Sequence, residues 1–257
     1  MSTEMNRLHA EWTKLRSVRS TYWTAAVAIL ASIGLGVIVC ARTAYNINHG
    51  QQDPHGLDAT LTSLNGLYLA QVAVGVLGVL TISSEYCTGM IRATLCAMPQ
   101  RRAMLAAKGA VFALATLIGG EILSFTAFGI GQALLASAHV GVSLHDPGVL
   151  RATIGGGLYL TAVGLLGFGI GALVRHTAGA VSSLFAVLFA LTAITELLPT
   201  NWRNVVINYL PANAGNQIFN VLHPHGALPP WTGLGVLCLY ALVAIIAAAV
   251  LIERRDT

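Results

Sequence analysis

The feature that most constrains this chain is a series of long runs that contain no charged side chain. Arg19 and Arg42 bracket one such run, and Arg151 and Arg175 bracket another. A helix needs about 20 apolar residues to cross a hydrocarbon core of roughly 30 Å. Each of these runs is long enough for one crossing, so we expect the bilayer to surround most of the chain.

The overall composition supports a membrane protein. Only 9% of the 257 residues are charged and 55% are hydrophobic, whereas an ordinary soluble domain carries about 25% charged residues. A soluble fold of this size could not cover its surface with so few charges. No cleavable signal peptide is evident, because the first apolar run begins only near Thr21, behind a charged segment.

The predicted fold is an all-α integral membrane protein whose transmembrane domain of six helices occupies residues 21–252. The spans are expected at residues 21–41, 64–83, 104–136, 152–174, 178–198 and 231–252. The third stretch is too long for one upright span and too short for two spans and a turn. We expect one long helix there, and a break at Gly119–Gly120 is left open.

Lysine and arginine are distributed unevenly between the connecting segments. With the N-terminus placed inside, only Arg42, Arg151 and Arg203 fall outside, and every other Lys and Arg falls on the cytoplasmic side. The positive-inside rule then predicts that both termini are cytoplasmic, including a short tail at 253–257. The net charge of +4 follows from this topology and gives no reason to expect nucleic acid as a partner.

Residues 1–20 are expected to form an amphipathic helix on the inner leaflet. Met5, Leu8 and Trp12 share one face at helical spacing, and basic residues supply charge near the headgroups. Two interpretations remain open, namely a simple polybasic anchor and a helix that also touches a cytoplasmic partner.

The cytoplasmic loop at residues 84–103 carries the most informative pattern. From Glu85 to Arg102 it reads E-Y-C-T-G-M-I-R-A-T-L-C-A-M-P-Q-R-R. Gly89 permits a turn, and Pro99 favours a break before the next helix. Judged by these residues alone, a docking helix parallel to the membrane and a simple solvated loop are equally open.

The pattern E-x-x-x-G-x-x-R-x-T-L-x-x-x-P-x-x-R, followed by Lys108, resembles the permeases of ABC exporters of the ABC-2 type. The run E-W-T-K-L-R-S, from Glu11 to Ser17, is similar to the N-terminal segment of many actinobacterial members. Met90 departs from the pattern, because members often carry Thr after the glycine.

The resemblance implies a type V exporter-like fold and a permease subunit in the cytoplasmic membrane, with export, including multidrug efflux, as its activity. The implied coupling loop would contact the ATPase through Glu85, Gly89, Arg92, Pro99, Arg101 and Arg102. The implied partners are two copies of an ABC ATP-binding subunit and a second permease copy, as a homodimer or a related heterodimer.

No ATP-binding motif is evident in the chain itself. Neither Lys14 nor Lys108 lies in a G-x-x-x-x-G-K-[ST] sequence, and no nucleophile motif is present. We therefore expect no enzymatic activity, no catalytic residues and no cofactor in this chain. ATP and Mg would be bound by the partner subunit.

Glu121 is the one charged residue deep within an expected span. An ionised carboxylate at the bilayer centre costs about 3 kcal/mol or more. Glu121 is therefore a candidate for the transport path or a proton site, and an interhelical hydrogen bond that fixes packing is the alternative. Two other functions stay open, namely an ion- or proton-coupled secondary carrier that uses Glu121, and a non-transporting membrane scaffold.

The external segment at residues 199–230 contains aromatic residues that are typical of an outer interface, among them Trp202 and Tyr209. In the resembled family this region forms a helical hairpin that caps the cavity. Six histidines are expected outside, namely His49, His55, His139, His145, His223 and His225. No spacing enforces a metal site, so we interpret them as polar loop residues and predict no metal.

Overall fold

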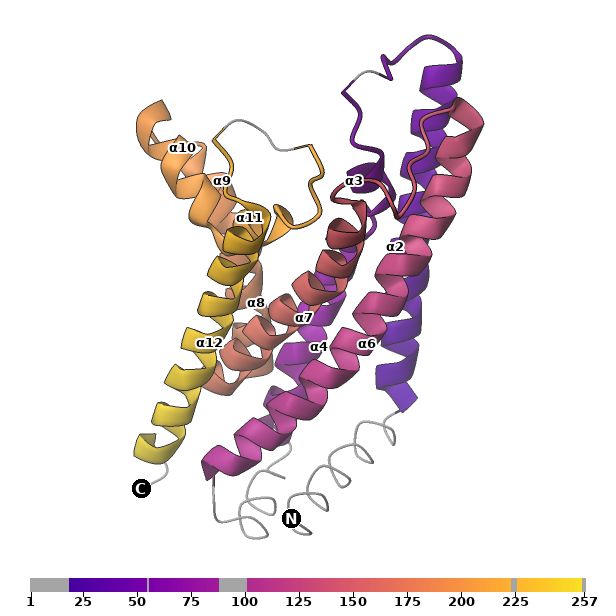
Figure 1. Cartoon of the computed structure of the whole chain (residues 1–257). Coiled ribbons are helices and arrows are strands. Elements are labelled where there is room, and N and C mark those ends of the chain that lie inside the picture. Colours follow the sequence, from indigo (N-terminus) through magenta and orange to yellow (C-terminus); the bar gives the residue numbers. More distant parts are fainter. Residues whose placement is uncertain (1–18, 55, 88–100, 223–225, 256–257) are drawn as a thin grey trace.

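The computed structural model describes residues 19–54, 56–87, 101–222 and 226–255, and all regular structure in these ranges is helical (Figure 1). Six helical runs are long and apolar enough to cross a membrane, which confirms the predicted all-α, six-span class. These runs are Ala26–Asn48, Leu67–Ser84, Arg102–Ala138, Val149–Val174, Thr177–Thr195 and Pro230–Ile252.

The long helices are α2 (Arg19–Asn48), α4 (Leu67–Cys87), α6 (Arg101–Leu135), α7 (Val149–Val174) and α12 (Pro230–Arg255). The short ones are α3 (Ala59–Ser63), α8 (Thr177–Phe185), α9 (Leu191–Thr195), α10 (Thr200–Tyr209) and α11 (Pro211–Asn216). A π-helical turn, Ala186–Ala190, joins α8 to α9, so the fifth span is one run. Helix α6 continues unbroken through Gly119 and Gly120.

The bundle has two distinct ends. Helix α2 begins and α12 ends at one of them, which we call the terminal end, while α3, α10 and α11 lie at the opposite, distal end (Figure 1). Helix α4 ends and α6 begins at the terminal end as well. Which end faces the cytoplasm stays a prediction.

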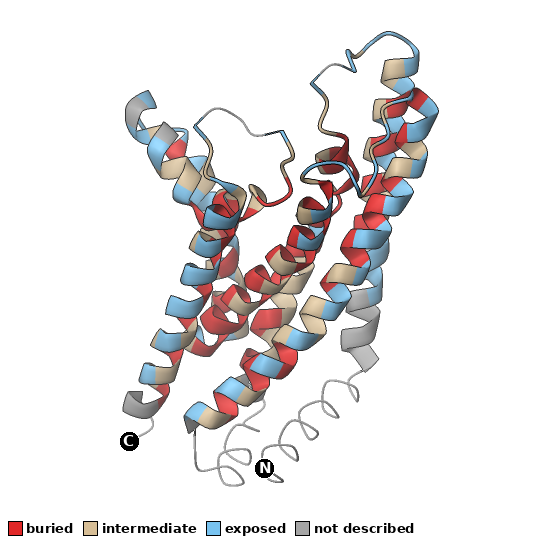
Figure 2. Cartoon of the chain, in the orientation of Figure 1, coloured by how far each residue is buried: buried red, intermediate tan, exposed pale blue. Residues whose placement is uncertain are grey.

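Helix α7 forms the core of the bundle. Within an 18-residue stretch of its span 72% of the residues are buried, against 17% in the corresponding stretch of α2 and 17% in that of α8 and α9. Figure 2 shows the buried residues concentrated on α7, with exposed faces on the surrounding helices. Since α7 carries mainly small and aliphatic residues without a charge after Arg151, it can be enclosed on all sides without leaving a buried ion.

Glycines bring the backbones of α4 and α7 into direct contact. A Cβ atom at Gly78 would lie 2.1 Å from the carbonyl oxygen of Gly164, and one at Gly167 would lie 2.2 Å from that of Gly75. No side chain larger than hydrogen fits at these positions. In a bilayer, helix association depends on such close packing, because lipid tails are as apolar as leucine.

We predict that Gly167→Ala destabilises the protein by about 1–3 kcal/mol, because the added methyl group must push α4 away from α7. Thermal unfolding of the detergent-solubilised chain, followed by circular dichroism, would measure the loss as a lower midpoint. The matched control is Gly119→Ala in α6, where an added Cβ has no atom within 4 Å. Equal midpoints for the two variants would contradict the proposed contact.

Candidate functional site

The coupling loop predicted from the sequence lies largely outside the described residues. Gly89, Arg92 and Pro99 fall in the range 88–100, which the structure does not describe. The side chains of Glu85 and Arg101 are not described either, although their backbones belong to α4 and α6 at the terminal end. Arg102 is exposed in the first turn of α6. The role of these six residues therefore stays a prediction, as does the amphipathic helix at residues 1–20.

The end of α4, immediately before this loop, is attached to the turn between α7 and α8. The Thr177 hydroxyl donates a hydrogen bond to Ser83 Oγ at 3.1 Å. The guanidinium carbon of Arg175 lies 5.0 Å from the ring centroid of Tyr86, which is a cation–π geometry. We call these four residues the α4 clamp. In the sequence, Arg175 is informative only as a charge that ends an apolar run. Nothing in its spacing from Tyr86 indicates the contact.

Lys108 ends the sequence motif and lies on α6, about two turns after the helix begins at Arg101. Its side chain is only 5% exposed. Lysine is almost never buried to this degree unless its ammonium group is paired, and Lys108 does have an interaction in the structure. The motif therefore continues into the packed interior of the terminal end.

Glu121 lies in the middle of the α6 span, where α6 crosses α7. A Cβ atom at Gly157 would lie 2.5 Å from the Cδ atom of Glu121, so the carboxyl group fits only because residue 157 is glycine. The Oε2 atom is buried and has no hydrogen-bond partner among the described residues. An interhelical hydrogen bond was the alternative role considered for Glu121. This oxygen does not make one.

Three other polar side chains of α6 and α7 do have partners. Ser124 donates to the Thr153 carbonyl oxygen at 2.6 Å, and the Tyr159 hydroxyl donates to Gln71 Oε1. Gln132 donates to the Ala59 carbonyl oxygen at 3.1 Å and to Ser63 Oγ at 2.9 Å. It also accepts the N–H of Val142 at 2.8 Å. Glu121 differs from these three side chains in leaving a buried oxygen without a bond.

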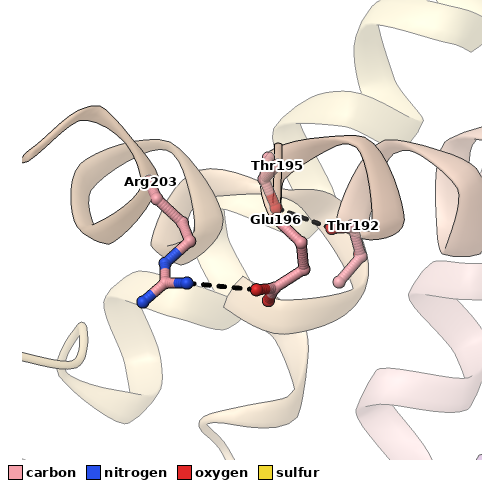
Figure 3. A network of polar contacts seen from close by, with 4 residues as sticks. All are labelled: Thr192, Thr195, Glu196 and Arg203. Carbon is pink, nitrogen blue, oxygen red and sulfur yellow. Dashed lines mark hydrogen bonds and ion pairs between the residues drawn. The ribbon is translucent and has the colours of Figure 1, made fainter. Parts of the chain in front are cut away.

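A second acid, Glu196, follows the fifth span directly and is paired at the distal end. Its Oε2 atom lies 3.2 Å from Arg203 Nη1, and the neighbouring Thr195 hydroxyl donates to the Thr192 carbonyl oxygen at 2.6 Å (Figure 3). The side chains of Arg203 and Glu196 are 37% and 59% exposed. An exposed ion pair of this kind contributes at most about 1 kcal/mol, so Glu196 is a surface residue of the turn before α10.

Two of the distal histidines, His49 and His145, have local side-chain partners. The ring of His49 stacks on that of Tyr45 at 3.9 Å, and His145 Nδ1 lies 3.3 Å from Ser143 Oγ. In the ranges that are described, no three His, Cys, Asp or Glu side chains lie together as a metal site would require. His55, His223 and His225 lie outside those ranges.

No protein-family model matches the chain, and a comparison with curated proteins finds no match either. The resemblance to ABC-2 permeases therefore depends on the loop motif and on residues 11–17. The structure adds the six-span helical architecture.

We predict that methionine substitutions at two positions of α6 change the free energy of unfolding in opposite directions. Glu121→Met removes a buried oxygen that lacks a partner and should raise the free energy of unfolding by about 1 kcal/mol. Gln132→Met breaks three hydrogen bonds at the distal end and should lower it by about 2 kcal/mol or more. Thermal midpoints in one detergent would compare them. If Glu121→Met is as destabilising as Gln132→Met, the Glu121 carboxyl group has a structural partner.

Proposed function

We propose that this chain is the membrane-spanning permease subunit of an ATP-driven exporter of the ABC-2 type, located in the cytoplasmic membrane. The observation that carries the proposal is the motif between α4 and α6, from Glu85 to Arg102 and on to Lys108. The six-span bundle is compatible with a transporter subunit. ATP and Mg would be bound by a separate ATPase subunit in two copies, and a second permease copy would complete the complex.

The α4 clamp supports a path for the mechanical signal. In the proposed mechanism, closure of the two ATPase subunits moves the loop after Tyr86. Because Tyr86 and Ser83 contact Arg175 and Thr177, such a movement would also act on the turn between α7 and α8. Helix α7 packs against α4, α6 and α12, so a displacement of its end would reach most of the bundle.

A second candidate function is supported by one observation at Glu121. A carboxyl group in the middle of a span, with one buried oxygen that lacks a hydrogen-bond partner in the described structure, is a reasonable proton carrier. In an ion- or proton-coupled secondary carrier, Glu121→Gln would abolish transport, and no ATPase would be needed. In the proposed exporter, transport would require ATP hydrolysis by the partner.

We predict that the chain co-purifies with a soluble P-loop ATPase encoded by a neighbouring gene. Arg92→Glu reverses a charge in the proposed coupling loop and should weaken the association about tenfold, since like charges at an interface repel. The binding constant of the tagged permease, reconstituted in nanodiscs, would be measured with the purified ATPase.

Glu196→Gln is the matched control for that measurement, because it changes a charge at the distal end. It should leave the association unchanged. If the wild-type chain never associates with such an ATPase, the exporter is the wrong function. If Arg92→Glu binds as tightly as the wild type, the loop is not the docking site.

A further inference from the structure

The segment that follows α11 returns into the bundle and inserts two apolar side chains at the distal end. Ile218 and Phe219 are both fully buried, at 0% exposure. The Phe219 ring makes edge-to-face contacts with Tyr159 of α7 at 4.9 Å and with Tyr68 of α4 at 6.2 Å. We call Ile218 and Phe219 the plug, because they fill the space between these helices at that end.

Glycine in α7 leaves the room that the plug occupies. A Cβ atom at Gly155 would lie 2.3 Å from Cγ1 of Ile218. The contact involves the branched part of the isoleucine, which has little freedom to move aside. The glycines of α7 therefore leave space for the plug as well as for α4.

The residues directly after the plug are held by two charged side chains from distant parts of the chain. Asp58 Oδ2 accepts the N–H of Val221 at 2.8 Å and that of Leu222 at 3.0 Å. Arg151 Nη2 donates to the carbonyl oxygen of Asn220 at 2.8 Å. We call Asp58 and Arg151 the latch. Hydrogen bonds to ionised groups are about twice as strong as neutral ones.

Asp58 is itself fixed in position. Its Oδ1 atom accepts the N–H of Leu61 at 2.9 Å and thereby caps the N-terminus of α3. The carboxylate therefore uses one oxygen to hold its own helix and the other to hold a segment 163 residues away. All of these contacts are hydrogen bonds, so they can break and form again without a change in covalent structure.

We propose that the latch releases the plug reversibly, and that this release is how the distal end of the bundle opens. The inference rests on the proposed function, because opening matters only in a protein that moves a substrate. A permanent brace would make the same contacts, but it would break only when the whole protein unfolds. The two cases differ in how the amides of Val221 and Leu222 exchange with solvent.

Hydrogen–deuterium exchange of the wild-type chain in lipid nanodiscs, read by mass spectrometry, separates the two. A reversible latch predicts that peptides ending near Leu222 exchange through local opening, much faster than peptides from the centre of α7. Asp58→Ala should raise that local rate about tenfold or more while leaving the α7 peptides unchanged. Gly155→Ala, which displaces Ile218, should act in the same direction.

Two matched controls are available in the same chain. Asp146→Asn alters a distal acid whose carboxylate accepts the N–H of Ser143 only three residues away. Gly119→Ala adds a methyl group where no atom lies within 4 Å. Neither should change exchange at Val221 and Leu222. Asp58→Asn, which keeps one acceptor oxygen, replaces Asp58→Ala if the alanine variant is not monodisperse on size exclusion.

Each outcome decides the proposal. Faster local exchange at Val221 and Leu222 in the Asp58 and Gly155 variants, with the α7 peptides unchanged, supports the latch. Exchange of these amides at the same slow rate as the α7 core in the wild type overturns it, and so does an equal rise in all peptides of the variants. The measurement needs no ATPase, so a failure of the proposed function would appear separately, as a failure of co-purification.

Discussion

The structure depends on the backbone contact between α4 and α7. Because Gly78 and Gly167 let the two helices meet without side chains between them, α7 can lie at the centre and offer its other faces to α6 and α12. Each candidate functional feature contacts α7. Glu121 lies where α6 crosses α7, the plug lies against Gly155, and the α4 clamp joins the terminal ends of α4 and α7.

The two ends of the bundle are built differently, and both are connected through α7. At the terminal end, the α4 clamp links the last turn of α4 to the turn after α7. At the distal end, Arg151 in the first turn of α7 and the glycine face beyond it hold the returning segment. A single continuous helix, α7, therefore connects the proposed site of ATPase contact with the proposed site of opening.

Much of the architecture could be predicted because charges are excluded from spans, and gaps between charges locate helices directly. The pairing of the helices could not be predicted in this way. The glycines of α7 indicate close packing, but nothing in the sequence says that Gly78 faces Gly164. Asp58 reads as an ordinary loop acid, since its partners lie 163 residues further along. Glu121 was found from its depth alone, whereas its fit against Gly157 required the crossing of two helices.

The central position of α7 has a consequence for biosynthesis. Three other described spans precede it along the chain, and they cannot complete this core before α7 is made. The 18-residue stretch of α2 keeps only 17% of its residues buried even in the finished bundle. Helix α2 can therefore stay surrounded by lipid before α7 is inserted. Helix α4 is different, because its glycine face is left open until α7 is inserted. Until then the groove along Gly75 and Gly78 is open to lipid or to a wrong helix, so correct assembly depends on how soon α7 follows α4.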